Sequence, residues 1–222
     1  DTTYFLNQYK IKKFKTFLSD FAPRHPHGRL TSFLGGINDS IFLFTSHGKS
    51  YMIYNIDNTP KLKRIQNNLK KIIQISDFFK PYPIDRHGVK DVIVNDDSSI
   101  FLSVTDTDLD KNCTYAKVLY SDGIKNDTLD DFKIIFKSEC VNLNKGQFHN
   151  KAAHMLGARI DFLKNQNKLV IALGMLNNFN LPQDDNNSYG KILSFPFNPD
   201  NPINEGILDE RVQVHVKGIR NP

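Results

Sequence analysis

The chain has 222 residues, of which 39% are hydrophobic and 24% are charged, a balance typical of folded globular proteins and not of disordered ones. The net charge is +5, but the basic residues are scattered, and the densest group, between Lys61 and Lys71, is interrupted by Ile, Gln and Asn. We therefore expect a solvated basic surface and no nucleic-acid partner. No stretch approaches the roughly 18 consecutive apolar residues of a membrane-spanning helix, so we expect no membrane span.

The sequence opens on Asp1 without an initiator Met, and its first residues show no signal-peptide pattern. We expect either a mature chain whose leader has been removed or a segment of a longer protein. Its length suits one large all-β domain or two small ones. The sequence contains no zinc-ligand spacing, P-loop, nucleophile elbow or dinucleotide fingerprint.

A repeat runs through the chain, in which a polar turn cluster precedes a short, apolar, β-prone run. The apolar runs begin at Ile41, Ile100 and Leu169, which are 59 and 69 residues apart. A candidate strand precedes each run, at 28–34, 88–94 and 157–163, and another follows it, at 51–56, 115–120 and 190–197. A fourth candidate closes the second and third units, at 132–136 and 211–216. The region 62–79 has mixed helical and strand character.

Four short strands per unit and a period of about 60 residues are the pattern of propeller blades. We expect an all-β fold, a single partial β-propeller domain over 1–222 with about three four-stranded antiparallel blades, at approximately 28–84, 85–145 and 146–222. A β-sandwich with a coincidental repeat is the alternative. Because an open ring of blades leaves raw sheet edges, we expect either a piece of a longer protein or a half-propeller that closes as a dimer.

The only two cysteines flank the outer strands predicted for the second unit. If Tyr120 faces Lys133 in an antiparallel pair, the same register places Cys113 opposite Cys140. That geometry predicts a disulfide, and a disulfide indicates an oxidising compartment. Two buried free thiols are the alternative.

From Asp85 onward, the sequence resembles the pyrroloquinoline-quinone (PQQ)-dependent glucose/sorbosone dehydrogenases. The segments that carry the resemblance are Arg86-His-Gly-Val-Lys-Asp-Val-Ile-Val94, Phe132-Lys-Ile-Ile-Phe-Lys137, His154-Met-Leu-Gly-Ala-Arg-Ile160, Lys168-Leu-Val-Ile-Ala-Leu-Gly174, Gly190-Lys-Ile-Leu193, Asn198-Pro-Asp-Asn-Pro202 and Gly218-Ile-Arg-Asn-Pro222. Their order and spacing follow the family pattern, whereas the N-terminal third matches only as a propeller repeat.

The resemblance implies a six-bladed propeller with PQQ across its mouth and calcium nearby, the calcium loop lying in blades beyond this chain. It implies oxidation of a small-molecule sugar or related alcohol in a periplasmic or secreted protein. His154 is then the candidate general base, and Arg220 and Asn221 match the pair that faces the cofactor. A neutral imidazole can take the hydroxyl proton, and a guanidinium suits carboxylates and quinone oxygens. No metal ligand is predicted within the chain.

Two features depart from the family pattern. His154 precedes Arg159 by five positions instead of four, so His154 keeps its place only if a β-bulge absorbs the extra residue, with His149 as a substitute. Met175 occupies the position of the acidic residue that orients the histidine, a role that Asn177, Asp184 or Asp185 would have to fill. These departures favour an alternative function, a non-catalytic envelope propeller that binds a glycan or protein partner.

Overall fold

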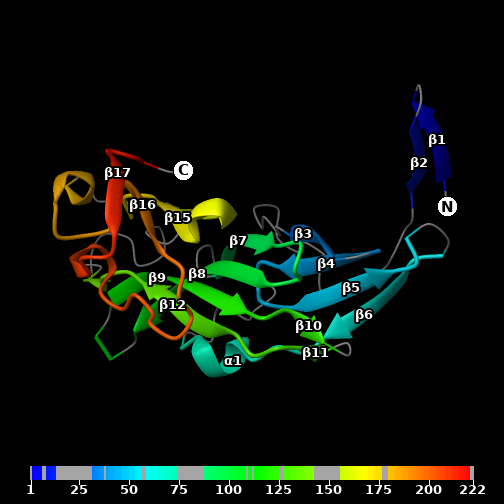
Figure 1. The fold of residues 1–222 in the computed structure, drawn as a ribbon, viewed down its shortest axis with the longest axis horizontal. Coiled ribbons are helices and arrows are strands. Elements are labelled where there is room, and N and C mark those ends of the chain that lie inside the picture. The colour runs from blue at the N-terminus through cyan, green and yellow to red at the C-terminus, as the bar shows by residue number, and fades with distance from the viewer. Residues whose placement is uncertain are drawn as a thin grey trace.

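The structure is a computed structural model, and its described part is almost entirely β-structure (Figure 1). It describes residues 2–6, 9–13, 32–37, 39–56, 59–74, 88–108, 110–111, 113–125, 128–142, 156–176 and 180–220. Strands β1 (Thr2–Leu6) and β2 (Tyr9–Lys13) pair as a separate antiparallel hairpin. The remaining long strands form three sheets, which we call blades one, two and three, and each follows the chain in antiparallel order.

Blade one contains β3 (Ser32–Ile37), β4 (Ser40–Thr45), β5 (Ser50–Tyr54) and β6 (Lys61–Ile65). The strand predicted at 28–34 begins at Ser32 among the described residues. The mixed region 62–79 is divided: β6 ends at Ile65, and the single helical turn α1 (Leu69–Ile72) follows. The side chain of Asn67 accepts the Leu69 N–H at 3.2 Å, which satisfies a donor at the start of this turn. Residues 75–79 lie outside the described part.

Blade two contains β7 (Gly88–Val94), β8 (Ile100–Asp108), β9 (Cys113–Ser121) and β12 (Lys133–Lys137), and the short β13 (Val141–Asn142) also pairs with β9. A small hairpin of β10 (Ile124–Lys125) and β11 (Thr128–Leu129) connects β9 to β12. The predicted pairing of Tyr120 with Lys133 is confirmed.

The register predicted for the two cysteines is wrong, although the disulfide is present. The β12–β9 pairing shifts at a bulge between Ile134 and Phe136, and Cys113 faces Asn142 on β13. Both Ile135 and Phe136 are buried in the same core as a result. Cys140 therefore lies in the break between β12 and β13, and the disulfide crosses the ladder obliquely with 5.4 Å between the Cα atoms.

Blade three contains β14 (Gly157–Leu163), β15 (Lys168–Leu173), β16 (Lys191–Pro196) and β17 (Gln213–Lys217). All four strands match predicted candidates to within three residues at either end. One-turn 3-10 helices lie at Lys164–Gln166, Leu181–Gln183 and Gly206–Leu208. Blade three also covers the outer edge of blade two, because Ile203 accepts from the Lys137 N–H and donates its own N–H to Ile135.

The blades stack face to face, with one apolar core on each side of blade two. On β8, Ile100, Leu102 and Val104 face blade one, whereas Phe101 faces blade three, as the two-residue period of a strand requires. The ring of Phe101 lies 5.1 Å from the rings of both Phe162 and Phe197. Strand β7 contacts β3 on one side and β14 on the other, so the first strands of the blades converge. This is the arrangement of consecutive propeller blades.

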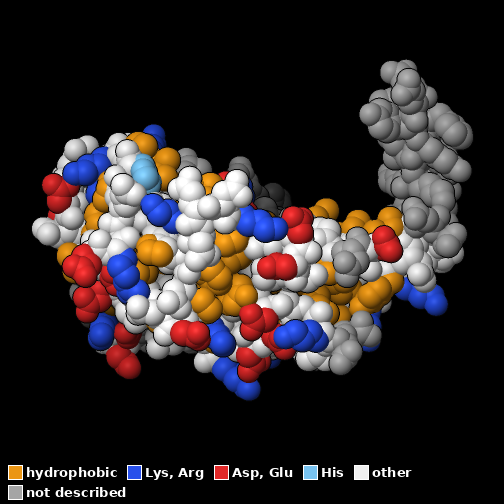
Figure 2. All heavy atoms as spheres, in the orientation of Figure 1, with side chains coloured by type: hydrophobic (Ala, Val, Ile, Leu, Met, Phe, Trp, Pro, Cys, Tyr) orange, Lys and Arg blue, Asp and Glu red, His pale blue; other side chains and the backbone are white. Residues whose placement is uncertain are grey.

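Charged side chains of both signs are interspersed over the face shown in Figure 2. Among the described residues, no helix is long and apolar enough to cross a membrane.

Candidate functional site

Arg220, the one predicted cofactor-facing residue that the structure describes, lies at one end of blade three. Antiparallel pairing places the start of β14 beside the end of β15, the start of β16 and the end of β17, through the row Gly157, Leu173, Lys191 and Lys217. Arg220 follows β17 and Met175 follows β15 at this end. We call it the loop end.

Backbone hydrogen bonds fix the segment that carries Arg220. The Met175 N–H donates to the Arg220 carbonyl at 3.2 Å, and the Ile219 N–H donates to the Gly190 carbonyl at 2.9 Å. The Gly190 N–H donates to Gly174, whose own N–H donates to Leu156 at 2.6 Å. The strand end that bears Arg220 is thereby linked through Gly190 to the residue just before β14.

Gly190 is required where it stands. Its φ is +70°, and a Cβ added there would lie 2.4 Å from Pro182 Cγ and 2.8 Å from Pro182 Cα. Any side chain would therefore both strain the backbone and overlap the neighbouring turn.

Lys191 is buried, and its ammonium serves the protein instead of a ligand. Its Nζ donates to the carbonyls of Leu181, Asp184 and Tyr189 at 3.1, 2.8 and 3.2 Å. Burial lowers the pKa of this ammonium by desolvation. Lys217 forms an ion pair with Asp185. Arg220 is exposed and forms no ion pair within the described part of the chain, so its guanidinium is open to an anionic ligand.

A β-bulge lies directly before Arg159, between the predicted positions of His154 and Arg159 in the chain. The β14–β15 register shifts between Gly157 and Arg159, and Ala158, the bulged residue, has a φ of +55°. Its carbonyl accepts a hydrogen bond from Ser103 Oγ at 2.5 Å, and Asp91 accepts the Ile160 N–H at 3.1 Å, so blade two supports the distorted strand. His154, His149 and Asn221 lie outside the described residues, and their predicted roles stay predictions.

Met175 is buried, with 3% of its surface exposed, and it brings no acidic group to the site. Asn177, one of its predicted replacements, lies outside the described residues. Asp184 accepts the Asn186 N–H at 2.9 Å, and this hydrogen bond is the main cause of its lowered pKa. Asp185 pairs with Lys217. Both candidate carboxylates are thus engaged in contacts that fix the loop between β15 and β16.

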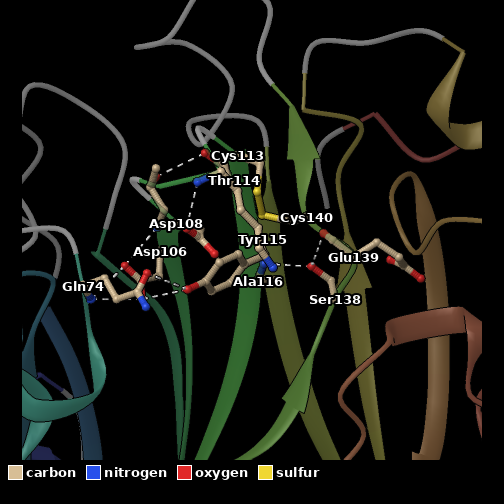
Figure 3. Close-up of a disulfide and its surroundings, with 12 residues drawn as sticks. Gln74, Asp106, Asp108, Cys113, Thr114, Tyr115, Ala116, Ser138, Glu139 and Cys140 are labelled. Atoms are coloured by element: carbon tan, nitrogen blue, oxygen red, sulfur yellow. Dashed lines mark hydrogen bonds between the residues drawn. A yellow bond between two sulfur atoms is a disulfide. The ribbon is translucent and has the colours of Figure 1, made fainter.

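A second polar cluster, which sequence reasoning missed, lies at the loop end of blade two (Figure 3). Asp106 and Lys117 form an ion pair at 2.8 Å, with side chains 0% and 4% exposed. Tyr115 directs its hydroxyl toward Asp106 and Gln74, at 3.4 and 3.5 Å, and burial is the main cause of its raised pKa. The available signal was an Asp and a Lys at core-facing positions of adjacent strands.

No group of three or more His, Cys, Asp or Glu side chains suited to a metal ion occurs in the described ranges. The disulfide Cys113–Cys140 lies beside the Asp106–Lys117 cluster (Figure 3). Within these ranges, the loop end therefore has the exposed Arg220 guanidinium, the β-bulge at Ala158, and a polar cluster whose members bond to one another.

No family model matches the sequence, and no curated protein matches it. Solved structures do match the fold. A glucose dehydrogenase matches with a TM-score of 0.56 and 19% identity, over 86% of this chain and 52% of that one. The apo soluble aldose sugar dehydrogenase from Escherichia coli matches with a TM-score of 0.54 and 19% identity, over 86% of this chain and 51% of that one.

The PQQ-bound form of the aldose sugar dehydrogenase from Streptomyces coelicolor matches with a TM-score of 0.55 and 15% identity, over 87% of this chain and 52% of that one. The chain therefore spans about half the length of the solved structures it matches. The fold is similar to about half of these sugar dehydrogenase structures, as the sequence predicted.

Proposed function

We propose that this chain supplies about three of six blades, and part of the active site, of a PQQ-dependent dehydrogenase that oxidises a sugar or related alcohol. The observation that carries the proposal is the bulge at Ala158, because a bulge between His154 and Arg159 is the condition under which His154 keeps the family position. The match to the PQQ-bound aldose sugar dehydrogenase from Streptomyces coelicolor supports the same reading.

In this proposal, His154 accepts the proton of the substrate hydroxyl, which requires a neutral imidazole close to that oxygen. Arg220 and Asn221 bind the anionic cofactor from the end of blade three. Their donors would stabilise negative charge on the cofactor, and the bond from the Met175 N–H to the Arg220 carbonyl fixes the backbone from which the guanidinium extends. The hydride acceptor for the carbinol carbon would be supplied by PQQ when it is bound.

The described residues fit the cofactor in part. An exposed guanidinium without an ion-pair partner in the described ranges suits a carboxylate-bearing quinone. Calcium finds no matching ligand cluster in the described ranges, so we derive no step through it. A structural disulfide is typical of oxidising compartments, and we place the protein in the periplasm or outside the cell.

The second candidate is a non-catalytic envelope propeller that binds a glycan or protein partner. It is favoured by the buried Met175 in place of an acidic residue and by the contacts that already engage Asp184 with Asn186 and Asp185 with Lys217. A histidine without an acidic partner is not held in one tautomer, which weakens a general base.

The test uses the protein with its native flanking sequence, incubated with PQQ and calcium. We expect calorimetric PQQ binding and dye reduction with aldoses. Arg220→Ala should weaken PQQ binding, whereas Arg64→Ala, which removes an exposed arginine from the outer strand β6, should not. His154→Asn should abolish dye reduction while leaving PQQ binding intact. Absence of PQQ binding in the unmodified protein would refute the dehydrogenase and leave the non-catalytic propeller.

A further inference from the structure

Blade two is held to both neighbours by buried polar contacts at the loop end, and the disulfide lies between them. Figure 3 shows Gln74, Asp106 and Tyr115 on one side of the disulfide, and Ser138 and Glu139 on the other. Cys113 comes two residues before Tyr115, and Cys140 directly follows Glu139. A single covalent bond therefore joins the two segments from which these contacts arise.

The contacts between blades one and two hold the end of α1 and the residues that directly follow it. Asp106 accepts the Gln74 N–H at 3.2 Å, and the Lys117 ammonium donates to the Ile72 carbonyl at 3.0 Å. Because Asp106 and Lys117 are buried, these bonds are shielded from water.

The junction with blade three depends on residues 138–139. The Glu139 carboxylate accepts the Ser188 N–H at 2.9 Å and the Ile207 N–H at 2.7 Å. The hydroxyl of the fully buried Tyr189 donates to the Glu139 carbonyl at 2.8 Å and lies 2.7 Å from Ser138 Oγ. Desolvation by burial raises the pKa of Tyr189, which keeps this hydroxyl protonated.

The segment 138–140 has little other support from the sheet. The β12–β9 ladder ends at the pair Lys137–Lys117, and pairing resumes at Val141–Thr114. Between them, the Ser138 N–H donates to the Ala116 carbonyl and Ser138 Oγ accepts the Ala116 N–H. The disulfide is the covalent support of this break. Cys113 is 5% exposed, whereas Cys140 is an exposed residue.

We propose that Cys113–Cys140 is a redox-sensitive lock on the junction between blades two and three. A thiolate of an external dithiol attacks Sγ of Cys140, the more exposed residue of the pair, and forms a mixed disulfide, and Cys113 leaves as a thiolate that takes a proton. The second thiol of the reductant then displaces Cys140. The protein gains two electrons and two protons, the dithiol becomes a disulfide, and Glu139 loses its covalent anchor.

The lock reaches the loop end of blade three through the backbone. Tyr189 directly precedes Gly190, and the Gly190 carbonyl holds the Ile219 N–H beside Arg220. Loosening Glu139 and Tyr189 therefore loosens the support of Arg220. This inference does not depend on the dehydrogenase chemistry, since a glycan-binding propeller with the same contacts carries the same lock.

The experiment compares amide hydrogen exchange in the oxidised protein, with its native flanking sequence, and in protein reduced by dithiothreitol, with alkylation and mass spectrometry to count thiols. The reporters are the Ser188 and Ile207 amides. We expect the exchange rates of these two amides to rise by at least about tenfold and at most about 400-fold. The upper value is the chain entropy that a 27-residue separation releases when the segment between the two cysteines opens locally. The β4–β5 amides of blade one serve as the internal control and should not change.

The paired variant Cys113→Ser with Cys140→Ser should reproduce the reduced pattern and ignore the reductant. If the Ser188 and Ile207 amides exchange equally in both states, the lock is refuted. It is refuted too if the β4–β5 amides accelerate to the same extent, because the disulfide would then be a staple of the whole fold. If the paired variant fails to fold and the unmodified protein unfolds on reduction, the disulfide stabilises the whole fold, and the lock is likewise refuted.

Discussion

Replacing Lys117 with Met should destabilise the protein strongly, because the substitution leaves the Asp106 carboxylate buried without its cation. The two charges are 2.8 Å apart, and their side chains are 4% and 0% exposed, so water cannot take over the role of the ammonium. Loss of one partner of such a pair costs about 3–5 kcal/mol of unfolding free energy. The Gln74 and Thr107 amides still donate to Asp106, which favours the lower end of that range.

The assay is urea denaturation of the single and double variants. Adding Asp106→Asn to Lys117→Met should recover at least half of the lost free energy, because no unpaired charge then stays buried. The matched control is Lys125→Met, which breaks a pair with Asp130 of the same 2.8 Å length at an exposed position and should leave the midpoint unchanged. Equal, small effects of Lys117→Met and Lys125→Met would refute the reasoning from burial.

Three further predictions concern blades two and three. Gly190→Ala should lower the free energy of unfolding in urea by at least about 1–2 kcal/mol, because the φ of Gly190 is left-handed and the added Cβ would overlap Pro182. Gly36→Ala is the control and should be neutral, because no atom lies within 4 Å of the added Cβ. Equal effects of the two substitutions would contradict the close contact at Gly190. Tyr189→Phe should cost about 1–3 kcal/mol by thermal or urea unfolding, since the Glu139 carbonyl loses its donor and the buried Ser138 hydroxyl loses a partner; an unchanged midpoint would rule this out. Burial lowers the pKa of Lys90 from 10.5 to about 8, so between these pH values the unfolded chain binds more protons than the folded one. The free energy of unfolding should therefore rise with pH, by about 2 kcal/mol from roughly pH 7.5 to 9.5. Lys90→Met should remove this rise, and an identical pH dependence in the variant would refute the assignment.

The sequence predicted most strands because polar turn clusters bounded short apolar runs. Strands β7 and β14 match the predicted ranges 88–94 and 157–163 at both ends. It failed at β6, where Lys61-Leu-Lys-Arg-Ile65 buries a single large residue, Ile65, and therefore shows no alternation. An outer strand with one core contact carries a charge pattern that a solvated loop would also show.

The disulfide could be predicted correctly although the predicted register of the two cysteines was wrong. Tyr120 and Lys133 anchor a long antiparallel pair, so the two cysteines meet at its far end even after a bulge displaces the ladder. The bulge itself has no signal in Ile134-Ile-Phe136, because all three residues suit either face of the sheet. The bulge at Ala158 could be stated only as a condition on His154.

The polar clusters explain how apolar blades acquire a fixed arrangement at the loop end. Contacts such as those of Phe101 with Phe162 and Phe197 supply stabilisation that depends little on direction. The bonds that the Asp106 and Glu139 carboxylates accept from Gln74 and Ser188 depend on direction, and a slip between blades would break them. Blade position near Arg220 is therefore set by polar contacts on both sides of blade two. Because the disulfide joins their segments, its redox state acts where blade position matters most for a ligand at the loop end.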